Sequence, residues 1–196
     1  MNQISVLKLK ITLLGTKPNV WRQIVIPAES TFYQLHMAIQ AAFGWENSHL
    51  FEFSKNGLMG PEGLRIGYPD DEIDTADAHD VLLQTVFCQE GDELKYVYDF
   101  GDYWDHRIKL EAIMQKEAYM PYCIDGKNEC PPEDVGGTHG YQEMIQTFSN
   151  GSTSEKKSYR TWLGLDTGED WDPTYYSQRE VNKRMALLTL IWNVFY

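Results

Sequence analysis

Residues 96–111, YVYDFGDYWDHRIKLE, contain two alternating patterns separated by a turn, and they constrain the fold more than any other stretch. Alternation at every second position is the side-chain period of a β-strand. The first pattern carries the aromatic residues Tyr96, Tyr98 and Phe100, and Gly101-Asp102 then forms a turn signal. The second pattern has an apolar face made by Trp104, His106, Ile108 and Leu110. The segment therefore predicts a β-hairpin with carboxylates at its turn and an inward-facing histidine.

The N-terminal part predicts a hairpin, a helix and a further strand. Apolar and polar residues alternate over residues 4–14, which predicts an antiparallel strand with one solvent-exposed face, and residues 20–26 predict a second strand paired with it. Thr31 and Gln34 fit a capping box at the start of a helix over residues 32–43. Residues 49–54 follow as a strand.

The remaining segments predict a loop over 55–80, a long connection over 112–140, and helices over 141–148, 155–163 and 177–195. A connection of that length inside a compact domain is usually functional or pinned in place. We find no internal repeat and expect one domain over residues 1–196. The fold class is α+β, with a mixed, mainly antiparallel sheet, a β-grasp-like opening and a helical C-terminal part.

Composition limits the classes of partner. The chain of 196 residues carries a formal charge of −12 and no block of basic residues, which disfavours general binding to nucleic acid or anionic membranes. Its three cysteines, Cys88, Cys123 and Cys130, form no CxxC pair, and no apolar stretch approaches the length of about 20 residues that a membrane span needs. We expect a cytoplasmic protein whose partner is a protein or a small molecule, with a homodimer as one option.

Asp99, Asp102 and His106 lie within eight residues around the central turn. Carboxylates and imidazoles so close together can bind a divalent metal or perform acid–base chemistry. The structural alternative is that the aspartates hydrogen-bond their own turn and that His106 is a core residue.

His36 and His49 lie on the apolar sides of their own predicted elements, as His106 does. Three imidazoles that point toward one core strengthen the metal or catalytic interpretation, although a single inward histidine is more often a hydrogen-bonded core residue. We therefore keep these three histidines as candidate ligands.

Trp21-Arg22 lies in the second strand, where Arg22 shares a face with Ile24 and Ile26. A buried arginine needs a carboxylate partner, because an unpaired buried charge costs several kcal/mol. Asp99 or Glu111 would serve. The alternatives are an arginine at a solvent-exposed edge and an arginine that binds an anion.

Cys130-Pro131-Pro132-Glu133-Asp134, followed by Gly136-Gly137, predicts a stiff loop that presents two carboxylates. Cys123 precedes Cys130 by seven residues, a spacing unlike that of a zinc ribbon or finger, so these two cysteines are weak candidates for a metal site. The structural alternative is a rigid loop whose own carboxylates, Glu133 and Asp134, hydrogen-bond within it.

Four groups of residues in this order resemble the plasmid pRiA4b ORF-3-like family. They are Val20-Trp21-Arg22 with Pro27; Leu35-His36, Phe43-Gly44-Trp45, His49-Leu50 and Phe53; Tyr98-Asp99-Phe100-Gly101-Asp102 with Trp104 and His106; and Pro131-Pro132-Glu133-Asp134 with Gly136-Gly137 and Gly140-Tyr141. Asp172-Pro173 and Asn182 extend the resemblance over nearly the whole chain.

The resemblance implies an association with mobile genetic elements, because members are often labelled insertion-element passenger or TnpR-like proteins. It supplies no activity to carry over, and the chain lacks the nucleophilic-serine and arginine pattern of a serine recombinase. Members often carry Cys where this chain has Val135, so a metal site built on those cysteines would be incomplete here.

Two functional hypotheses follow. The first is a non-enzymatic binding module with an aromatic-lined groove and no bound metal, for which Trp21, Trp45, Tyr98 and Trp104 are the aromatic candidates. We favour it because no GxGxxG, Walker A, HExxH or GxSxG motif is present and because buried aromatic, histidine and carboxylate networks often fix a fold. The alternative is a metal-assisted or acid–base hydrolase that uses the histidines and aspartates around the DFGD turn.

Overall fold

The computed structural model describes residues 3–55, 63–69, 74–166 and 168–192. Within this part of the chain, eight strands form one sheet in the order β5-β4-β3-β6-β7-β1-β2-β8, antiparallel except for the β4–β5 pair. The strands are β1 (Ile4–Leu13), β2 (Trp21–Pro27), β3 (Phe51–Ser54), β4 (Arg65–Gly67), β5 (Ala76–Asp77), β6 (Glu93–Tyr98), β7 (Trp104–Lys116) and β8 (Tyr122–Lys127). The predicted α+β class with a mainly antiparallel sheet is confirmed.

The predicted central hairpin is formed by β6 and β7, in a register that pairs Tyr96 with His106 and Tyr98 with Trp104. Their inward side chains, with Leu9 and Ile11 of β1, form the middle of the core and are fully buried. The expected opening of hairpin, helix and strand is present as β1, β2, α1 (Phe32–Phe43) and β3. The β6–β7 hairpin lies between β1 and β3 in the sheet.

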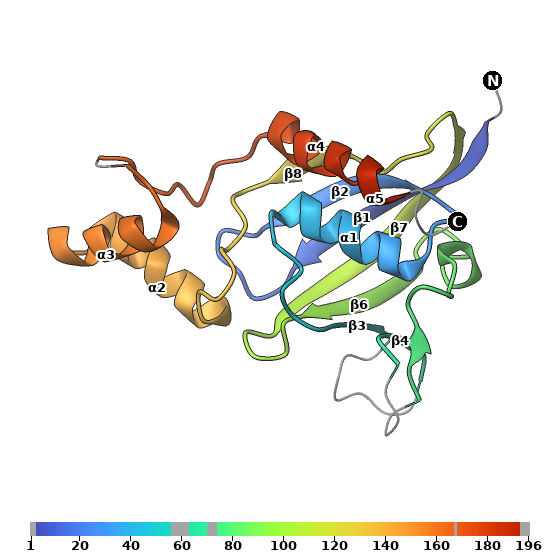
Figure 1. Ribbon diagram of the computed structural model, residues 1–196, viewed down its shortest axis with the longest axis horizontal. Coiled ribbons are helices and arrows are strands. Elements are labelled where there is room, and N and C mark those ends of the chain that lie inside the picture. The colour runs from blue at the N-terminus through green and yellow to red at the C-terminus, as the bar shows by residue number, and fades with distance from the viewer. Residues whose placement is uncertain (1–2, 56–62, 70–73, 167, 193–196) are drawn as a thin grey trace.

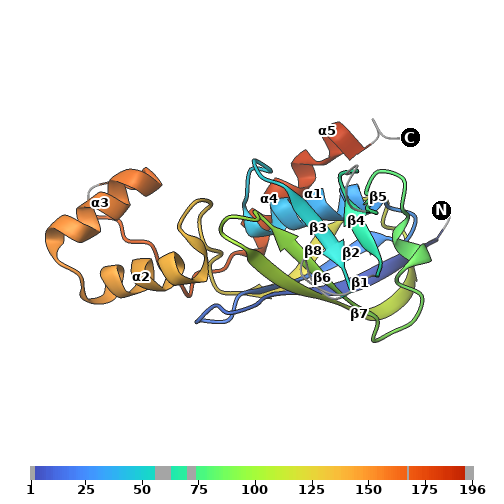
Figure 2. The same ribbon diagram turned by 90° about the horizontal axis from the view of Figure 1, so that it is seen from below.

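One face of the sheet is covered by α1 and by α4 (Gln178–Leu187), which continues into the short α5 (Thr189–Trp192). Thr31 and Gln34 form the predicted capping box of α1, and Gly44 ends that helix with φ 87°, a backbone angle that suits glycine. Figures 1 and 2 show α2 (Gly137–Asn150) and α3 (Thr153–Leu163) projecting away from the sheet. We call these two helices the α2–α3 arm.

Three predictions about local structure were wrong. The connection over 112–140 contains the end of β7 and the whole of β8, because β7 continues along β1 past a bulge and β8 pairs with the outer edge of β2. The loop over 55–80 contains β4 and β5. The C-terminal helix is divided near Leu188, so α2, with 14 residues, is the longest of the described helices.

No described helix combines the length and the apolar character that crossing a membrane requires.

Candidate functional site

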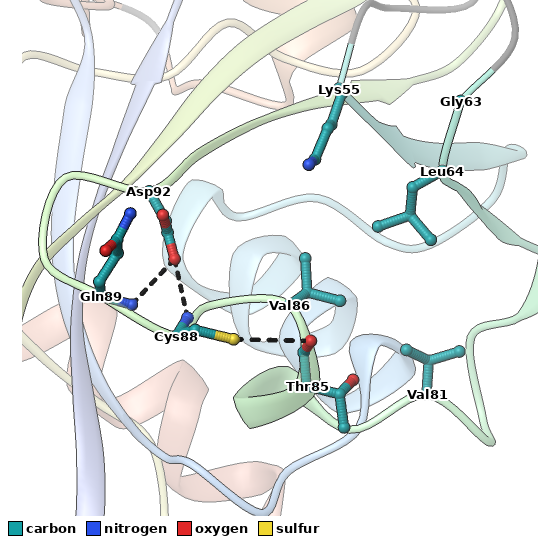
Figure 3. A pocket seen from close by; sticks show the side chains of 9 residues that line it. All are labelled: Lys55, Gly63, Leu64, Val81, Thr85, Val86, Cys88, Gln89 and Asp92. Carbon is teal, nitrogen blue, oxygen red and sulfur yellow. Dashed lines mark hydrogen bonds between the residues drawn. The ribbon is translucent and has the colours of Figure 1, made fainter.

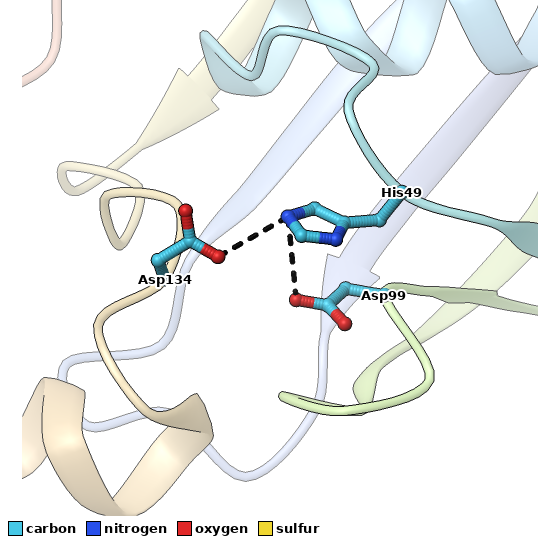
Figure 4. Close-up of side chains that lie close together, drawn as sticks. All are labelled: His49, Asp99 and Asp134. Atoms are coloured by element: carbon cyan, nitrogen blue, oxygen red, sulfur yellow. Dashed lines mark ion pairs between the residues drawn. The ribbon is translucent and has the colours of Figure 1, made fainter.

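His49, Asp99 and Asp134 come together from three separate segments, and we call them the histidine–aspartate cluster (Figure 4). The Nε2 atom of His49 lies 3.2 Å from Oδ1 of Asp134 and 3.7 Å from Oδ2 of Asp99. The three side chains differ in exposure: Asp99 is 10% exposed, His49 30% and Asp134 71%. The cluster therefore lies at the surface with one buried wall.

Asp99 is fixed by the turn that joins β6 to β7. Its backbone N–H donates to the Leu50 carbonyl at 2.9 Å, and its carbonyl accepts from Tyr103 at 2.7 Å. Its Oδ1 accepts from the Gly101 N–H at 2.9 Å, which leaves Oδ2 directed toward His49. The backbone of Asp99 has φ 56°, a left-handed angle that aspartate tolerates better than most residues.

Asp134 is presented by the loop between β8 and α2, which two contacts hold against the rest of the molecule. The indole N–H of Trp45 donates to the Pro131 carbonyl at 2.9 Å, and the Gly136 N–H donates to Oδ2 of Asp102 at 3.1 Å.

A third contact joins this loop to β6, since the Tyr98 hydroxyl donates to the Glu133 carboxylate. Burial, and secondarily this carboxylate, raises the pKa of Tyr98, so the phenol stays protonated as a donor. Asp102, Glu133 and Trp45 therefore position the loop that carries Asp134.

The ligand atoms of the cluster all lie within 4.8 Å of one another, a separation that one cation can bridge. His49 Nε2 is shielded from solvent and makes no hydrogen bond within the described chain. Imidazole nitrogen and carboxylate oxygen are donors suited to zinc, manganese and related divalent ions. Without an ion, a protonated His49 between the two carboxylates would form an ion-paired surface cluster instead.

His36 and His106, grouped with His49 by their inward facing, lie apart from the cluster in the core. His36 is hydrogen-bonded through Nδ1 to the Tyr96 hydroxyl at 2.8 Å and through Nε2 to Asn47 at 2.6 Å. Nδ1 of His106 donates to the Trp104 carbonyl at 2.8 Å. Burial lowers the pKa of each histidine to about 4, so both are neutral near pH 7 and fully enclosed.

The tryptophans named for a binding groove lie in different places. Trp45 and Trp104 are buried in the core, where Trp45 stacks on Tyr98 with ring centroids 5.1 Å apart and on Trp104 with ring centroids 5.9 Å apart. Trp21 lies on the opposite face of the sheet, where Lys10 Nζ is 4.6 Å from its ring. The three rings therefore do not line one groove.

Arg22 is 2% exposed, and its donors are used inside the protein. Nε donates to the Ala42 carbonyl at 3.1 Å, Nη1 to the carbonyls of Trp21 and Lys127 at 2.9 and 3.1 Å, and Nη2 to the sulfur of Cys130 at 3.0 Å. Such an arginine joins β2, β8 and α1, and its donors are not available to an external anion.

The carboxylate partner expected for Arg22 is not among its contacts. Asp99 pairs with His49, and Glu111 pairs with Lys8 at 3.3 Å on the outer face of the sheet. Backbone carbonyls take the place of a carboxylate because Arg22 lies where three chain segments meet.

Cys123 and Cys130 are buried and take no part in the cluster. Cys123 Sγ is 3.2 Å from the Asp125 carbonyl, and Cys130 contacts Arg22. Burial raises the pKa of both thiols, that of Cys130 to about 12, which keeps them in the protonated form that binds metals poorly.

Comparison with known proteins places these motifs in a family. Residues 5–180 match the family model described as plasmid pRiA4b ORF-3-like protein. The chain belongs to the plasmid pRiA4b ORF-3-like family. The protein y4hQ of Sinorhizobium fredii, described as uncharacterized, is 35% identical over 192 residues, which cover 96% of this chain and 94% of that protein. The crystal structure of MM3350 from Methanosarcina mazei Go1, described as a protein of unknown function, has a TM-score of 0.77 at 34% identity and covers 92% of this chain and 98% of its own.

In this pRiA4b ORF-3-like protein, the cluster is built where three of the resembling segments meet, those containing His49, Asp99 and Asp134. Sequence reasoning named all three residues but assigned Asp134 to a separate loop and grouped His49 with His36 and His106. The order of the motifs along the chain carried no information about distance, because Asp134, 35 residues after Asp99 in the sequence, lies on a loop that folds back onto the β6–β7 turn.

Proposed function

We propose that this pRiA4b ORF-3-like protein is a non-enzymatic binding module that takes a divalent cation at the histidine–aspartate cluster. The observation that carries the proposal is the approach of one imidazole and two carboxylates to within 4.8 Å. The networks around His36 and Arg22 support a binding role over acid–base chemistry, because internal hydrogen bonds consume those groups.

A metal-dependent hydrolase is the second candidate. Three protein ligands leave further coordination positions for water or substrate, which is the arrangement of catalytic rather than structural zinc sites. The 71% exposure of Asp134 supports this candidate, because such positions would then be open to solvent.

We expect chelator-treated protein to bind one divalent ion per chain, measured by isothermal titration with zinc, manganese and magnesium near neutral pH. His49→Gln and Asp134→Asn should each weaken binding by at least about tenfold, the lower end of the loss seen for groups that merely support a metal ligand. Asparagine tolerates the positive φ of 59° at position 134, so this variant keeps the loop conformation.

His139→Gln is the matched control, because His139 is 86% exposed on α2 and, within the described part of the chain, forms an ion pair with Glu143 alone. It should bind the ion as the parent protein does. Absence of binding for all three ions in the parent protein would show that the cluster is an ion-paired surface feature. Metal-dependent cleavage of chromogenic phosphate or carboxylate esters, lost in Asp134→Asn, would favour the hydrolase over the binding module.

We also propose a genetic context and a class of partner for this protein. The family resemblance supports an association with mobile genetic elements. The charge of −12 supports a protein or small-molecule partner rather than nucleic acid.

A further inference from the structure

A cavity of about 670 Å³ lies beside the 3-10 helix Leu83–Thr85, where β3 ends and β6 begins (Figure 3). This volume is in the range that small organic ligands occupy. Its lining residues are Lys55, Gly63, Leu64, Val81, Thr85, Val86, Cys88, Gln89 and Asp92.

One wall of the cavity is aliphatic. Leu64, Val81 and Val86 are partly buried and pack against the hydrophobic core, and Figure 3 shows their side chains on the same side of the cavity. A wall of this kind favours a ligand with an alkyl portion, because each buried methylene gains about 0.8 kcal/mol in the transfer from water.

The charged groups of the cavity differ in their availability. Asp92 accepts hydrogen bonds from the backbone N–H groups of Cys88 and Gln89 at 2.8 and 2.9 Å. The amine of Lys55 points into the cavity (Figure 3) and forms neither an ion pair nor a hydrogen bond with any described residue. The hydrogen bonds from Gln89 and Cys88 lower the pKa of the Asp92 carboxyl group, and the charge of Lys55 adds to this effect. The cavity therefore offers, next to an apolar wall, a lysine amine that makes no direct contact with a carboxylate of the described chain.

The cavity is separate from the histidine–aspartate cluster. His49 precedes β3 and Lys55 follows it, while Asp92 precedes β6 and Asp99 follows it. The two sites thus lie at opposite ends of the same strand pair, about 20 Å apart at about 3.3 Å per residue. Occupation of one site can be tested without the other.

We propose that this cavity binds a small amphipathic carboxylate, with its head group on Lys55 and its alkyl chain against Leu64, Val81 and Val86. The positive charge of Lys55 favours an anionic head group, and the aliphatic wall favours an alkyl tail. Asp92 sets the orientation, because its own negative charge keeps a carboxylate on the Lys55 side.

Cys88 supplies a reporter for this site. It lines the cavity and is exposed, whereas Cys123 and Cys130 are buried, so a maleimide reagent should label only Cys88 in the folded protein. Octanoate at ten times its dissociation constant should slow this labelling about tenfold, because about one tenth of the sites then remain free. Octanol and octylamine have the same alkyl chain but no carboxylate, so they should protect Cys88 from labelling less than octanoate does.

Lys55→Met keeps an unbranched side chain and removes the charge, and we expect it to abolish most of the protection by octanoate. Lys157→Met is the matched control, because Lys157 is exposed on α3 in the α2–α3 arm, and it should be protected as the parent protein is. Equal protection by octanoate and octylamine, or full protection in Lys55→Met, would overturn the assignment of Lys55. Unchanged labelling at all octanoate concentrations would overturn the site itself, and neither result would bear on cation binding at His49.

Discussion

Acidification from pH 6.5 to pH 4 is expected to lower the free energy of unfolding, and the two buried histidines, His36 and His106, should contribute about 6 kcal/mol to that loss. His36 and His106 are enclosed in the core, and burial lowers the pKa of each from 6.5 to about 4. Each histidine then contributes about 3 kcal/mol, since one pKa unit corresponds to about 1.4 kcal/mol. Their sum is comparable with the whole stability of a typical domain.

The direction of this effect follows from proton binding. Between pH 6.5 and 4 the unfolded chain protonates both histidines, whereas the folded protein keeps them neutral. Stability is therefore fully present above pH 6.5 and is lost as the pH falls toward 4. Glu52 and Glu129 oppose the trend, because burial raises the pKa of each, so the net loss will be smaller than the sum.

Urea unfolding at a series of pH values measures this dependence. His106→Gln retains a side-chain N–H donor and removes the titrating group, so it should remove about half of the loss between pH 6.5 and 4. His139→Gln is the matched control for the loss of an imidazole, because His139 is 86% exposed on α2, and it should leave the free energy of unfolding at pH 6.5 unchanged. A parent protein whose free energy of unfolding stays constant to pH 4 would show that one or both buried histidines are already protonated in the folded state.

Arg22→Leu is expected to lower the free energy of unfolding by about 3–5 kcal/mol, the cost of removing one partner from a buried polar network. The substitution leaves the carbonyls of Ala42, Trp21 and Lys127 without the donors they have in the native protein. It also removes the connection among β2, β8 and α1. Equilibrium urea unfolding, monitored by the fluorescence of the buried tryptophans, measures the change.

Two variants separate charge from geometry at this position. Arg22→Lys keeps the positive charge but replaces the planar guanidinium, with its several N–H donors, by a single ammonium group. We therefore expect it to recover only part of the free energy of unfolding that Arg22→Leu loses. Arg107→Leu, on an exposed position of β7, should change the free energy of unfolding by less than about 0.5 kcal/mol. A loss below about 1 kcal/mol for Arg22→Leu would contradict the structural role of Arg22.

The central hairpin and the first helix could be predicted from local pattern, because strict alternation over 96–111 and the Thr31–Gln34 capping box are short-range signals. The edge strand β8 could not, since YCIDGK lacks regular alternation and is held as a strand by its pairing with β2. The break near Leu188 was equally invisible, because apolar spacing continues through it.

The sequence singled out His49, Asp99 and Asp134 as candidates, but it did not indicate that these three lie together. Inward facing correctly indicated that His36 and His106 are buried, yet burial separates them from His49, which lies at the surface beside Asp99 and Asp134. The contact partners of Arg22 were missed for a related reason, because backbone carbonyls from three segments leave no trace in the side-chain pattern. Lys55 and its cavity depend on how β3, β6 and the 3-10 helix meet, which no local pattern records.

Asp134 lies only three residues before α2, and Gly136 and Gly137, the residue before the helix and its first residue, adopt φ 92° and 64°. The 14 residues of α2 extend about 21 Å at 1.5 Å per residue. A tilt of about 10° at this glycine pair would therefore displace the far end of the helix by about 4 Å. A small rotation of the backbone at Gly136 and Gly137 would therefore be amplified along α2 into a displacement of several ångströms where α2 joins α3.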